Sequence, residues 1–205
     1  DLFLLDAGAE TEMGYAGDMT STIPADATYT TRQKEIYDIV IASHEASIKE
    51  LRPGVTFESV YDTSAKVIVE GLKSLGFMRG DAAEAVKAGA HALFYPHGLG
   101  HMMGLDVHDM ENLGEIYVGH NGQPKSTQFG RKSLRLGRML EPGFVHTIEP
   151  GIYFIPELID LWRSERKFEE FINYEKVVTY KDFGGIRNEA DYLITPTGSR
   201  LLGKQ

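Results

Sequence analysis

Three of the seven histidines in the chain lie within twelve residues of one another, and glycines separate them. The stretch covers residues 96–109 and contains His97, His101 and His108. Imidazoles bind metal ions and transfer protons near neutral pH. Glycine buries no side chain, and it lets the backbone pass close to a ligand or a neighbouring strand. This pattern indicates a functional site rather than a packing element.

Carboxylates occupy a second set of unusual positions, inside apolar runs that have the composition of strands. Asp6 follows an apolar tripeptide, Glu149 ends a strand-like run that begins at residue 144, and Glu189 precedes the apolar residues 192–194. A buried carboxylate is costly unless it is paired or bound to a metal. A single acid of this kind is most simply explained by an ion pair with an arginine. Several of them beside a histidine stretch favour a shared site.

The set Asp6, Asp18, His101, Glu149 and Glu189 carries more negative charge than one divalent ion neutralises. Four carboxylates and one neutral imidazole suit two neighbouring divalent ions with bridging carboxylates. Two ions that share a water molecule lower its pKa and make a hydroxide nucleophile. The chain has no cysteine, so every ligand must be oxygen or imidazole nitrogen, which favours Mn²⁺, Co²⁺, Fe²⁺ or Zn²⁺.

The overall composition is that of a globular protein with one sizeable core. The 205 residues are 42% hydrophobic and 25% charged. The net charge of −9 argues against binding to nucleic acid or to an anionic membrane surface. No apolar run approaches the length of a membrane span and no signal peptide is visible, so we expect a cytoplasmic protein. Because the chain opens inside a strand-like run, we also expect a preceding segment.

Hydrophobic periodicity predicts helices in the first half of the chain, with strands on either side. A strand hairpin at 2–24 carries Asp6 on its first strand and Asp18 on its second. Thr30 and Gln33 have the spacing of a helix capping box. The expected helices are 30–51, 56–75, 81–92 and 157–172, the expected later strands are 144–149, 152–155, 175–180 and 186–195, and 111–138 is expected to be an irregular loop. This order indicates the α+β class rather than strict βαβ alternation.

The order of the motifs resembles that of the pita-bread metallopeptidases, and within them the branch of Xaa-Pro dipeptidase (prolidase) and aminopeptidase P. The resemblance runs through the whole chain and rests on Asp6 with Asp18, His97-Gly98-Leu99-Gly100-His101, Asp106-Val107-His108, Glu149-Pro150-Gly151-Ile152-Tyr153 and Gly185-Ile186-Arg187-Asn188-Glu189. It implies that residues 1–205 are a metallopeptidase catalytic domain with a pita-bread fold, in which helices pack outside a curved antiparallel sheet. It also implies that this domain is the C-terminal portion of a longer protein, truncated here on its N-terminal side.

The resemblance assigns a role to each motif residue. The implied metal ligands are Asp6, Asp18, His101, Glu149 and Glu189. Asp18 and Glu189 would bridge the two ions, and Glu149 would also shuttle a proton.

Four further residues would face the substrate. His97 and His108 would bind the peptide and stabilise the charge that develops on its carbonyl oxygen. Arg187 would lie just outside the metals and orient a carboxylate. Arg135 would contact the carboxyl end of the substrate.

The implied activity is hydrolysis of the bond between an N-terminal residue and a following proline in short peptides. The implied cofactors are two divalent ions, with Mn²⁺ expected first and Co²⁺ or Zn²⁺ as alternatives. The choice between dipeptidase and aminopeptidase stays open, and a homodimer is common in the family. No nucleic-acid or membrane partner is expected.

Other proteins with the same fold provide the alternatives. Creatinase-like enzymes and a histone-chaperone subunit, which only binds, share the architecture without the metal set, whereas all five ligand positions here are acids or histidine. A methionine aminopeptidase is a nearer alternative. The helical insertion expected at 157–172 and the turn at 183–185 favour the prolidase branch.

The remaining histidines are expected to be structural. His44 lies in the middle of a predicted helix, and His91 lies at the end of another, where the helix dipole favours a cation. His120 lies in the predicted loop. His146 stands three residues before Glu149, so strand alternation puts it on the opposite face.

Overall fold

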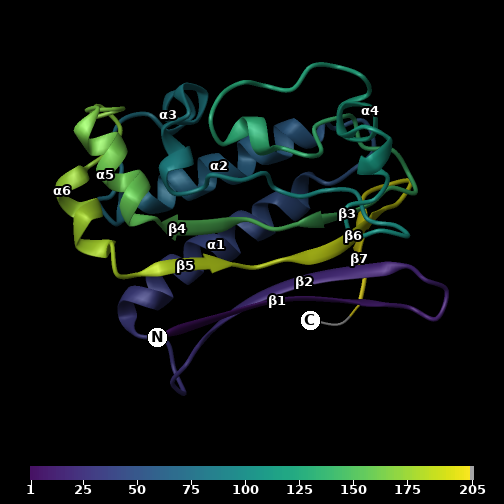
Figure 1. Cartoon of the computed structure of the whole chain (residues 1–205), viewed down its shortest axis with the longest axis horizontal. Helices are drawn as coiled ribbons and strands as arrows, with labels where there is room; N and C mark the ends of the chain where they lie inside the picture. The colour runs from purple at the N-terminus through teal and green to yellow at the C-terminus, as the bar shows by residue number, and fades with distance from the viewer. Residues whose placement is uncertain (204–205) are drawn as a thin grey trace.

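The computed structural model describes residues 1–203 and arranges them as a layer of helices beside a set of antiparallel strands (Figure 1). The strands are β1 (Leu2–Glu10), β2 (Ala16–Pro24), β3 (Val145–Ile148), β4 (Gly151–Phe154), β5 (Gly184–Arg187), β6 (Ala190–Ile194) and β7 (Ser199–Leu201). The α-helices are α1 (Thr31–Glu50), α2 (Phe57–Ser74), α3 (Ala82–Ala88), α4 (Glu115–His120), α5 (Pro156–Ser164) and α6 (Tyr174–Val177). Short 3₁₀ helices are η1 (Ala90–Leu93), η2 (Glu111–Leu113), η3 (Arg131–Ser133) and η4 (Val178–Tyr180).

The centre of the fold is a long two-stranded ribbon made of four short strands. β3 pairs with β6 and β4 pairs with β5, and both pairs are antiparallel. The first ladder ends with Ile148 opposite Ala190, and the second begins with Gly151 opposite Arg187, so one register continues across the break between them. Pro150 falls in the break and has no amide hydrogen for a ladder. The break therefore interrupts the hydrogen bonding between the strands, but the side chains on both sides of it keep the same alternation between the two faces of the ribbon.

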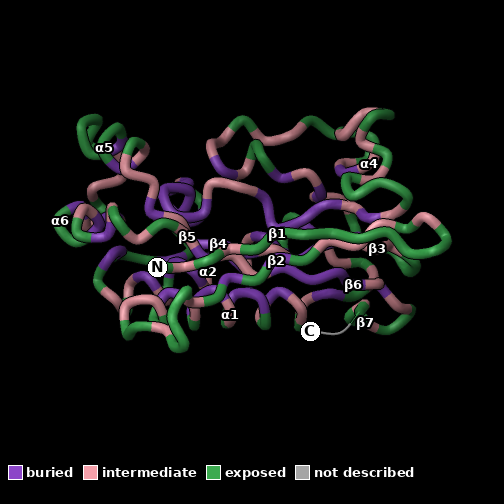
Figure 2. The backbone as a smooth tube through the Cα atoms, turned by 60° about the horizontal axis from the view of Figure 1, so that its bottom comes forward, coloured by how far each residue is buried: buried purple, intermediate pink, exposed green. Residues whose placement is uncertain are grey.

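The β1–β2 hairpin attaches to this ribbon through few backbone bonds. Within the hairpin, Asp6 lies opposite Thr20 and Gly8 lies opposite Asp18, which confirms the predicted placement of one acid on each strand. The amide of Glu189 donates to the carbonyl of Thr20 at 2.9 Å and joins β2 to the start of β6. The hairpin is exposed along much of its length, in contrast to the ribbon behind it (Figure 2).

Helices α1 and α2 provide much of the core. The predicted capping box is present, because the Thr30 hydroxyl accepts from the Gln33 amide and the Gln33 side chain accepts from the Thr30 amide. Both helices bury an apolar stripe, in which Ile36, Val40 and Ile68 are completely buried. Within residues 1–203, no helix is both long and apolar enough to cross a membrane.

The predicted strand at 175–180 is wrong, because this segment is helical and forms most of α6 and η4. Tyr174, Val177 and Tyr180 are three residues apart and all buried, so their spacing fits one face of a helical turn. The Val-Val-Thr run has strand propensity, but the packing of Tyr180 edge-on against Phe77 in the aromatic core decides the outcome.

The helix predicted at 157–172 is right only in its first half. It forms α5, which ends at Ser164. Beyond it, Arg166 and Phe168 both have a left-handed backbone with φ of 54°, which no α-helix accommodates. The apolar spacing of the later residues reflects contacts made by turns rather than by a continuous helix.

Three other predicted elements differ in extent. The helix predicted at 81–92 ends at Ala88, because Gly89 takes φ of 91° and terminates it, and η1 follows. The expected loop 111–138 contains η2, α4 and η3. The strand expected at 186–195 is divided into β5 and β6 by the same break that interrupts β3 and β4.

Gly71 in α2 marks a close approach of α1 and α2. A Cβ at this position would lie 2.6 Å from Cγ1 and 2.7 Å from Cγ2 of Ile39, whose β-branched side chain is stiff. We expect Gly71→Ala to destabilise the protein by about 1–2 kcal/mol net, because overpacking outweighs the gain in helix propensity. Denaturant unfolding measures the change.

The control for this substitution is Lys66→Ala on the exposed face of the same helix. It should stay within about 0.5 kcal/mol of wild type. A Gly71→Ala protein that is as stable as wild type would contradict the close packing of the two helices.

Candidate active site

One pocket gathers every residue that the sequence analysis assigned to a site. Its volume is about 660 Å³. The nine predicted residues that line it are Asp6, Asp18, His97, His101, His108, Arg135, Glu149, Arg187 and Glu189. They come from both ends and the middle of the chain, so the fold assembles them from distant segments.

The backbone arrangement explains why the histidine stretch contains glycine. The segment from Leu99 to His101 lies beside β3, where the amide of Thr147 donates to the carbonyl of His101 (3.0 Å) and the amide of Glu149 donates to the carbonyl of Leu99 (2.8 Å). A Cβ at Gly100 would collide with the backbone carbonyl of Thr147. Glycine is required there because two backbones meet. This contact brings Nε2 of His101 to 3.8 Å from Oε1 of Glu149.

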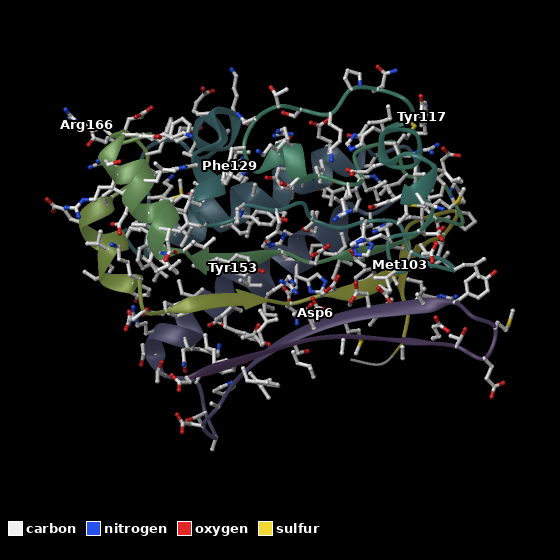
Figure 3. All side chains as sticks on the ribbon, in the orientation of Figure 1. Asp6, Met103, Tyr117, Phe129, Tyr153 and Arg166 are labelled. Atoms are coloured by element: carbon white, nitrogen blue, oxygen red, sulfur yellow. The ribbon has the colours of Figure 1, made fainter. Side chains whose placement is uncertain are left out.

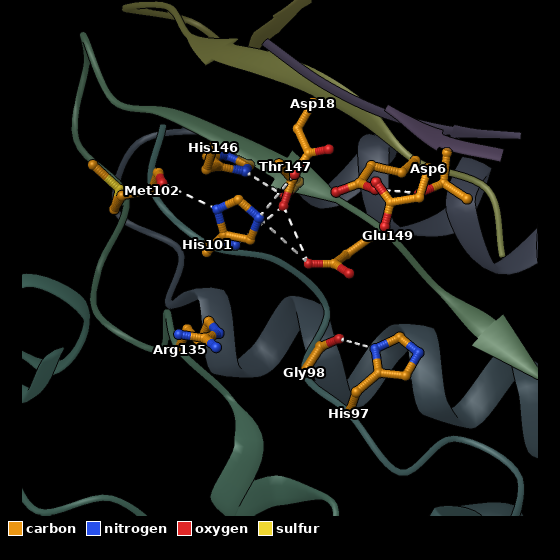
Figure 4. A network of polar contacts seen from close by, with 12 residues as sticks. Asp6, Asp18, His97, Gly98, His101, Met102, Arg135, His146, Thr147 and Glu149 are labelled. Atoms are coloured by element: carbon orange, nitrogen blue, oxygen red, sulfur yellow. Dashed lines mark hydrogen bonds and ion pairs between the residues drawn. The ribbon is translucent and has the colours of Figure 1, made fainter. Parts of the chain in front are cut away.

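Asp18, His101 and Glu189 form a tight cluster in the pocket. One ligand atom from each lies within 4.8 Å of the other two, and Nε2 of His101 is 3.5 Å from Oδ2 of Asp18. Nδ1 of His101 lies 3.1 Å from the carbonyl oxygen of Met102, and because a carbonyl only accepts, Nδ1 carries the proton of the neutral ring. The lone pair of Nε2 therefore faces the carboxylates (Figure 4), as in a metal-ligating histidine.

Two glutamates of the pocket, Glu149 and Glu189, ionise less readily than free glutamates. Burial raises the pKa of Glu149 above its ordinary value, against the opposing charges of His101 and Arg187. Burial also raises the pKa of Glu189, and the nearby charge of Glu149 raises it further. Burial is the largest single effect and would lower the pKa of His101, but the contact with Asp18 and the charges of Glu149 and Glu189 together outweigh it, and the pKa rises. Such a site needs added positive charge before all of its acids ionise.

The residues present fit a divalent metal ion. The cluster offers carboxylate oxygens and an imidazole nitrogen, which suit Mn²⁺, Co²⁺, Fe²⁺ or Zn²⁺. Outer partners hold two of these groups in place. The Thr20 hydroxyl donates to Oε2 of Glu189 at 2.5 Å, and the backbone amide of Asp18 donates to the Asp191 carboxylate at 3.0 Å.

Asp6 lines the same pocket but lies outside this cluster. Its side chain is 49% exposed and pairs with Arg187, whose Nη2 is 2.5 Å from Oδ2 of Asp6. Nη1 of Arg187 donates to the hydroxyl of Tyr153 at 2.9 Å. The guanidinium thus links Asp6 of β1 to Tyr153 of β4, which lie near each other where the hairpin meets the ribbon (Figure 3). The ligand role of Asp6 stays a prediction.

His97 and His108 reach the pocket in different states. Nδ1 of His97 lies 2.7 Å from the carbonyl oxygen of Gly98, so Nδ1 carries the proton and the buried Nε2 has no protein partner among the described residues. Burial lowers the pKa of His97 to about 4, so the ring is neutral near pH 7 and its Nε2 only accepts. Burial also lowers the pKa of His108, which packs edge-on against His101 with ring centroids 4.3 Å apart.

Arg135 and Lys125 bring basic groups to the pocket. Arg135 pairs with Glu111, and Lys125 pairs with Glu115 at the start of α4. All four residues belong to the segment that was expected to be an irregular loop. Figure 4 shows Arg135 apart from the carboxylates around His101. The carboxylates around His101 therefore form an acidic region of the pocket, whereas Arg135 and Lys125 are each paired with an acid.

The sequence analysis did not assign to the site Thr20, Thr147 and Asp191, whose side chains bond to predicted metal ligands. It also did not assign Tyr153, which lines the pocket and accepts from Arg187. Thr147 and Asp191 stand two residues from Glu149 and Glu189 along the ribbon. Strand alternation puts residues two apart on the same face, so this signal could have found them. The bonds that they make were not visible in the sequence.

The remaining histidines lie outside the pocket. His146 is completely buried, edge-on against Phe57 with ring centroids 5.0 Å apart. The dipole explanation for His91 is wrong, because this residue is buried in η1 with Nε2 2.8 Å from the Tyr61 hydroxyl. Burial lowers the pKa of His91 to about 4, so it is neutral and gains nothing from a helix dipole.

Comparison with known proteins gives the class. The sequence matches metallopeptidase family M24 over residues 1–196. The chain therefore belongs to this family.

Individual relatives indicate one branch of this family, the Xaa-Pro dipeptidases and aminopeptidases. The Xaa-Pro dipeptidase of Homo sapiens is 36% identical over 202 residues, which cover 98% of this chain and 40% of that protein. The Xaa-Pro aminopeptidase of Escherichia coli is 40% identical over 202 residues, which cover 98% of this chain and 37% of that protein. The predicted resemblance to this branch is confirmed, and the chain spans about two fifths of the length of these relatives.

Solved structures agree with the sequence comparison. A variant of Escherichia coli aminopeptidase P in complex with substrate matches with a TM-score of 0.73 and 38% identity, over 98% of this chain and 37% of that one. A Zn-substituted form of the same enzyme in complex with product also matches with a TM-score of 0.73. Together with the helices and antiparallel strands described above, these matches confirm the predicted α+β pita-bread fold.

Glu189 should destabilise the metal-free protein when it ionises, because its pKa in the folded state is raised above the ordinary value of 4.5. The penalty is absent below that value and grows as the pH rises through the raised pKa. Glu189→Gln removes the charge and keeps an acceptor for Thr20. We expect this variant to be more stable than wild type without metal by about 1–3 kcal/mol at pH 8, with the gap closing toward pH 5.

Thermal unfolding in the presence of a chelator, at pH 5 and at pH 8, measures this gap. Glu175→Gln on the exposed side of α6 is the control and should show no gap that changes with pH. The electrostatic account fails if Glu189→Gln is less stable than wild type at pH 8 without metal.

Proposed function

We propose that this chain is the catalytic domain of a cytoplasmic peptidase that hydrolyses the bond between an N-terminal residue and a following proline, with two divalent ions, Mn²⁺ first among them. The observation that carries the proposal is the cluster of Asp18, His101 and Glu189 inside a pocket lined by all the other predicted site residues. The Xaa-Pro dipeptidase and aminopeptidase relatives support the substrate class.

The acidic region would hold the metal ions. Asp18, His101 and Glu189 already converge, and Asp6 and Glu149 line the same pocket as the further ligands that a second ion needs. The chemistry that such a centre supplies is a water molecule with a lowered pKa, available as a nucleophile near neutral pH. Co²⁺ and Zn²⁺ suit the same donors.

Glu149 is suited to carry the proton that the leaving nitrogen requires. The nitrogen of a peptide-bound proline is a tertiary amide, and it must be protonated before it departs as an amine. Oε1 of Glu149 lies 3.8 Å from Nε2 of His101, at the edge of the cluster, where it would accept a proton from the attacking water and pass it to the leaving nitrogen. The Thr147 hydroxyl lies 3.4 Å from Oε1 of Glu149 and helps to orient it.

His97 and His108 would make different hydrogen bonds to the substrate. His97 is neutral and presents Nε2 as an acceptor, which suits an N–H group of the peptide. The charge that develops on the carbonyl oxygen needs a hydrogen-bond donor instead. His108 lies against His101, beside the cluster, and is the histidine placed to provide that donor. Arg187 would act through the Asp6 carboxylate that it holds.

Removal of divalent ions should abolish hydrolysis of an Xaa-Pro dipeptide by the full-length protein, and added Mn²⁺ or Co²⁺ should restore it. Without the ions, no group in the pocket activates water, so we expect a loss of at least about 100-fold in kcat/KM. A release assay for free proline measures the rate. Hydrolysis that persists in excess chelator would rule out the metal centre.

A matched pair of variants localises this effect. Asp18→Asn should stay inactive when Mn²⁺ is added, because it loses a charged ligand of the cluster. Asp26→Asn changes an exposed acid outside the pocket and should respond to Mn²⁺ as wild type does.

Arg135 should distinguish a dipeptidase from an aminopeptidase. If its guanidinium binds the free carboxylate of an Xaa-Pro dipeptide, Arg135→Gln should lower kcat/KM for that substrate by about 10- to 100-fold, the value of a charged hydrogen bond. The amidated dipeptide, which lacks this carboxylate, should change by less than about threefold.

The control for this comparison is Arg138→Gln. Arg138 pairs with Glu141 and does not line the pocket. An equal loss for the free and amidated peptides in Arg135→Gln would remove Arg135 from carboxylate recognition and favour longer peptides as substrates.

A further inference from the structure

Thr147 and Asp191 form a cross-strand pair beside the proposed metal centre. They lie opposite each other in the ladder between β3 and β6. Thr147 is completely buried and Asp191 is 9% exposed. Glu149 and Glu189 stand two residues further along the two strands, so the pair shares the face that carries these acids.

Each member of the pair accepts a hydrogen bond from the backbone amide of a different predicted metal ligand. Oγ1 of Thr147 accepts from the amide of His101 at 3.1 Å. Oδ2 of Asp191 accepts from the amide of Asp18 at 3.0 Å. The Thr147 hydroxyl can also donate to Oε1 of Glu149, 3.4 Å away. Three of the predicted ligands are thus tied to two adjacent side chains.

These bonds matter because the segments that they hold lack a regular ladder to β6. β2 belongs to a two-stranded sheet with β1, separate from the sheet that contains β3 and β6. His101 lies outside the assigned strands, in a segment that pairs with β3 rather than with β6 through an isolated bridge between Met102 and His146. A ladder sets the register of two strands through repeated backbone bonds. Backbone bonds to β3 at Leu99, His101 and Met103 already align the segment of His101. The Thr147 hydroxyl adds a side-chain contact that fixes the amide of His101, and the Asp191 carboxylate does the same for the amide of Asp18.

Aspartate at position 191 is unfavourable for the stability of the fold in two ways. Oδ1 of Asp191 is buried and has no hydrogen-bond partner among the described residues. The carboxylate also adds negative charge next to Asp18, a position where the pocket is already acidic. A neutral side chain would support a strand without this penalty. A local arrangement that is unfavourable for stability is typical of functional sites.

We infer that Thr147 and Asp191 are positioning residues that hold the backbones of His101 and Asp18 and thereby set the affinity of the metal centre. The inference rests on the proposed function. Neither residue belongs to the cluster of converging ligand atoms. Asp191 therefore acts through the Asp18 amide, and Thr147 acts through the His101 amide and the Glu149 carboxylate. Removal of an outer partner typically weakens metal binding by about 10- to 100-fold.

The test compares variants that remove the acceptor with variants that keep it. Thr147→Val and Asp191→Ala remove it, whereas Thr147→Ser and Asp191→Asn keep it. In calorimetric titrations of Mn²⁺ into metal-free, full-length protein, the first two should bind about 10- to 100-fold more weakly than wild type. The two conservative variants should stay within about threefold, because they keep the bond to the amide.

A surface substitution provides the matched control. The Asp182 carboxylate pairs with Arg32 and does not line the pocket, so Asp182→Ala should bind Mn²⁺ as wild type does. Asp191→Asn that binds as weakly as Asp191→Ala would overturn the inference, because charge rather than the accepted amide would then set the affinity. This comparison holds even if Asp191→Ala does not fold, since a large loss in Asp191→Asn alone contradicts the inference.

Hydrogen exchange in the metal-free protein separates this inference from the proposed function. Asp191→Ala should speed exchange of the Asp18 amide by at least about tenfold and leave the His101 amide unchanged, and Thr147→Val should do the reverse. Unchanged exchange at both amides would overturn the positioning role. If wild type binds no Mn²⁺, the metal centre fails, and the exchange rates alone decide whether the pair holds these backbones.

Discussion

Several acids of like charge are buried together in the active-site pocket. Asp18, Glu149 and Glu189 share one pocket with His101, and burial raises the pKa of both glutamates. Such a group of acids is stable only if positive charge is added or protons remain bound. A divalent ion supplies this charge directly, which is why the energetics and the ligand chemistry of the pocket lead to the same conclusion. Arg187 supplies part of it at the edge of the pocket.

The fold assembles the acids by interrupting regular strand pairing. Glu149 and Glu189 fall in the break of the central ribbon, where no continuous ladder dictates the backbone. The register is the same on both sides of the break, so the two acids still approach from facing strands. His101 joins them because Gly100 lets its segment lie against β3. Irregular backbone at the site is therefore supported by regular structure on either side and by α1 and α2 behind it.

Prediction from the sequence succeeded where short-range chemistry decides the structure. The capping box at Thr30 and the hairpin with its two acids are local patterns, and the motif residues converge because motif order reflects the fold. The prediction failed at 175–180, where residues with strand propensity form helical turns. Packing against the aromatic core, including Phe77, determines this structure, and no local sequence pattern reveals that packing. The tautomer of His97 also depends on a carbonyl whose direction only the folded backbone sets. The bonds of Asp191 to another strand were hidden for the same reason.

We propose that the pocket holds divalent ions between the hairpin and the ribbon. Anomalous diffraction from crystals of the full-length protein grown with Mn²⁺ tests it most directly, because it locates the ion without reference to activity. We expect an anomalous peak within ligand distance of Asp18, His101 and Glu189, with a second peak toward Asp6. A structure in which Mn²⁺ is bound elsewhere and these side chains coordinate nothing would contradict it.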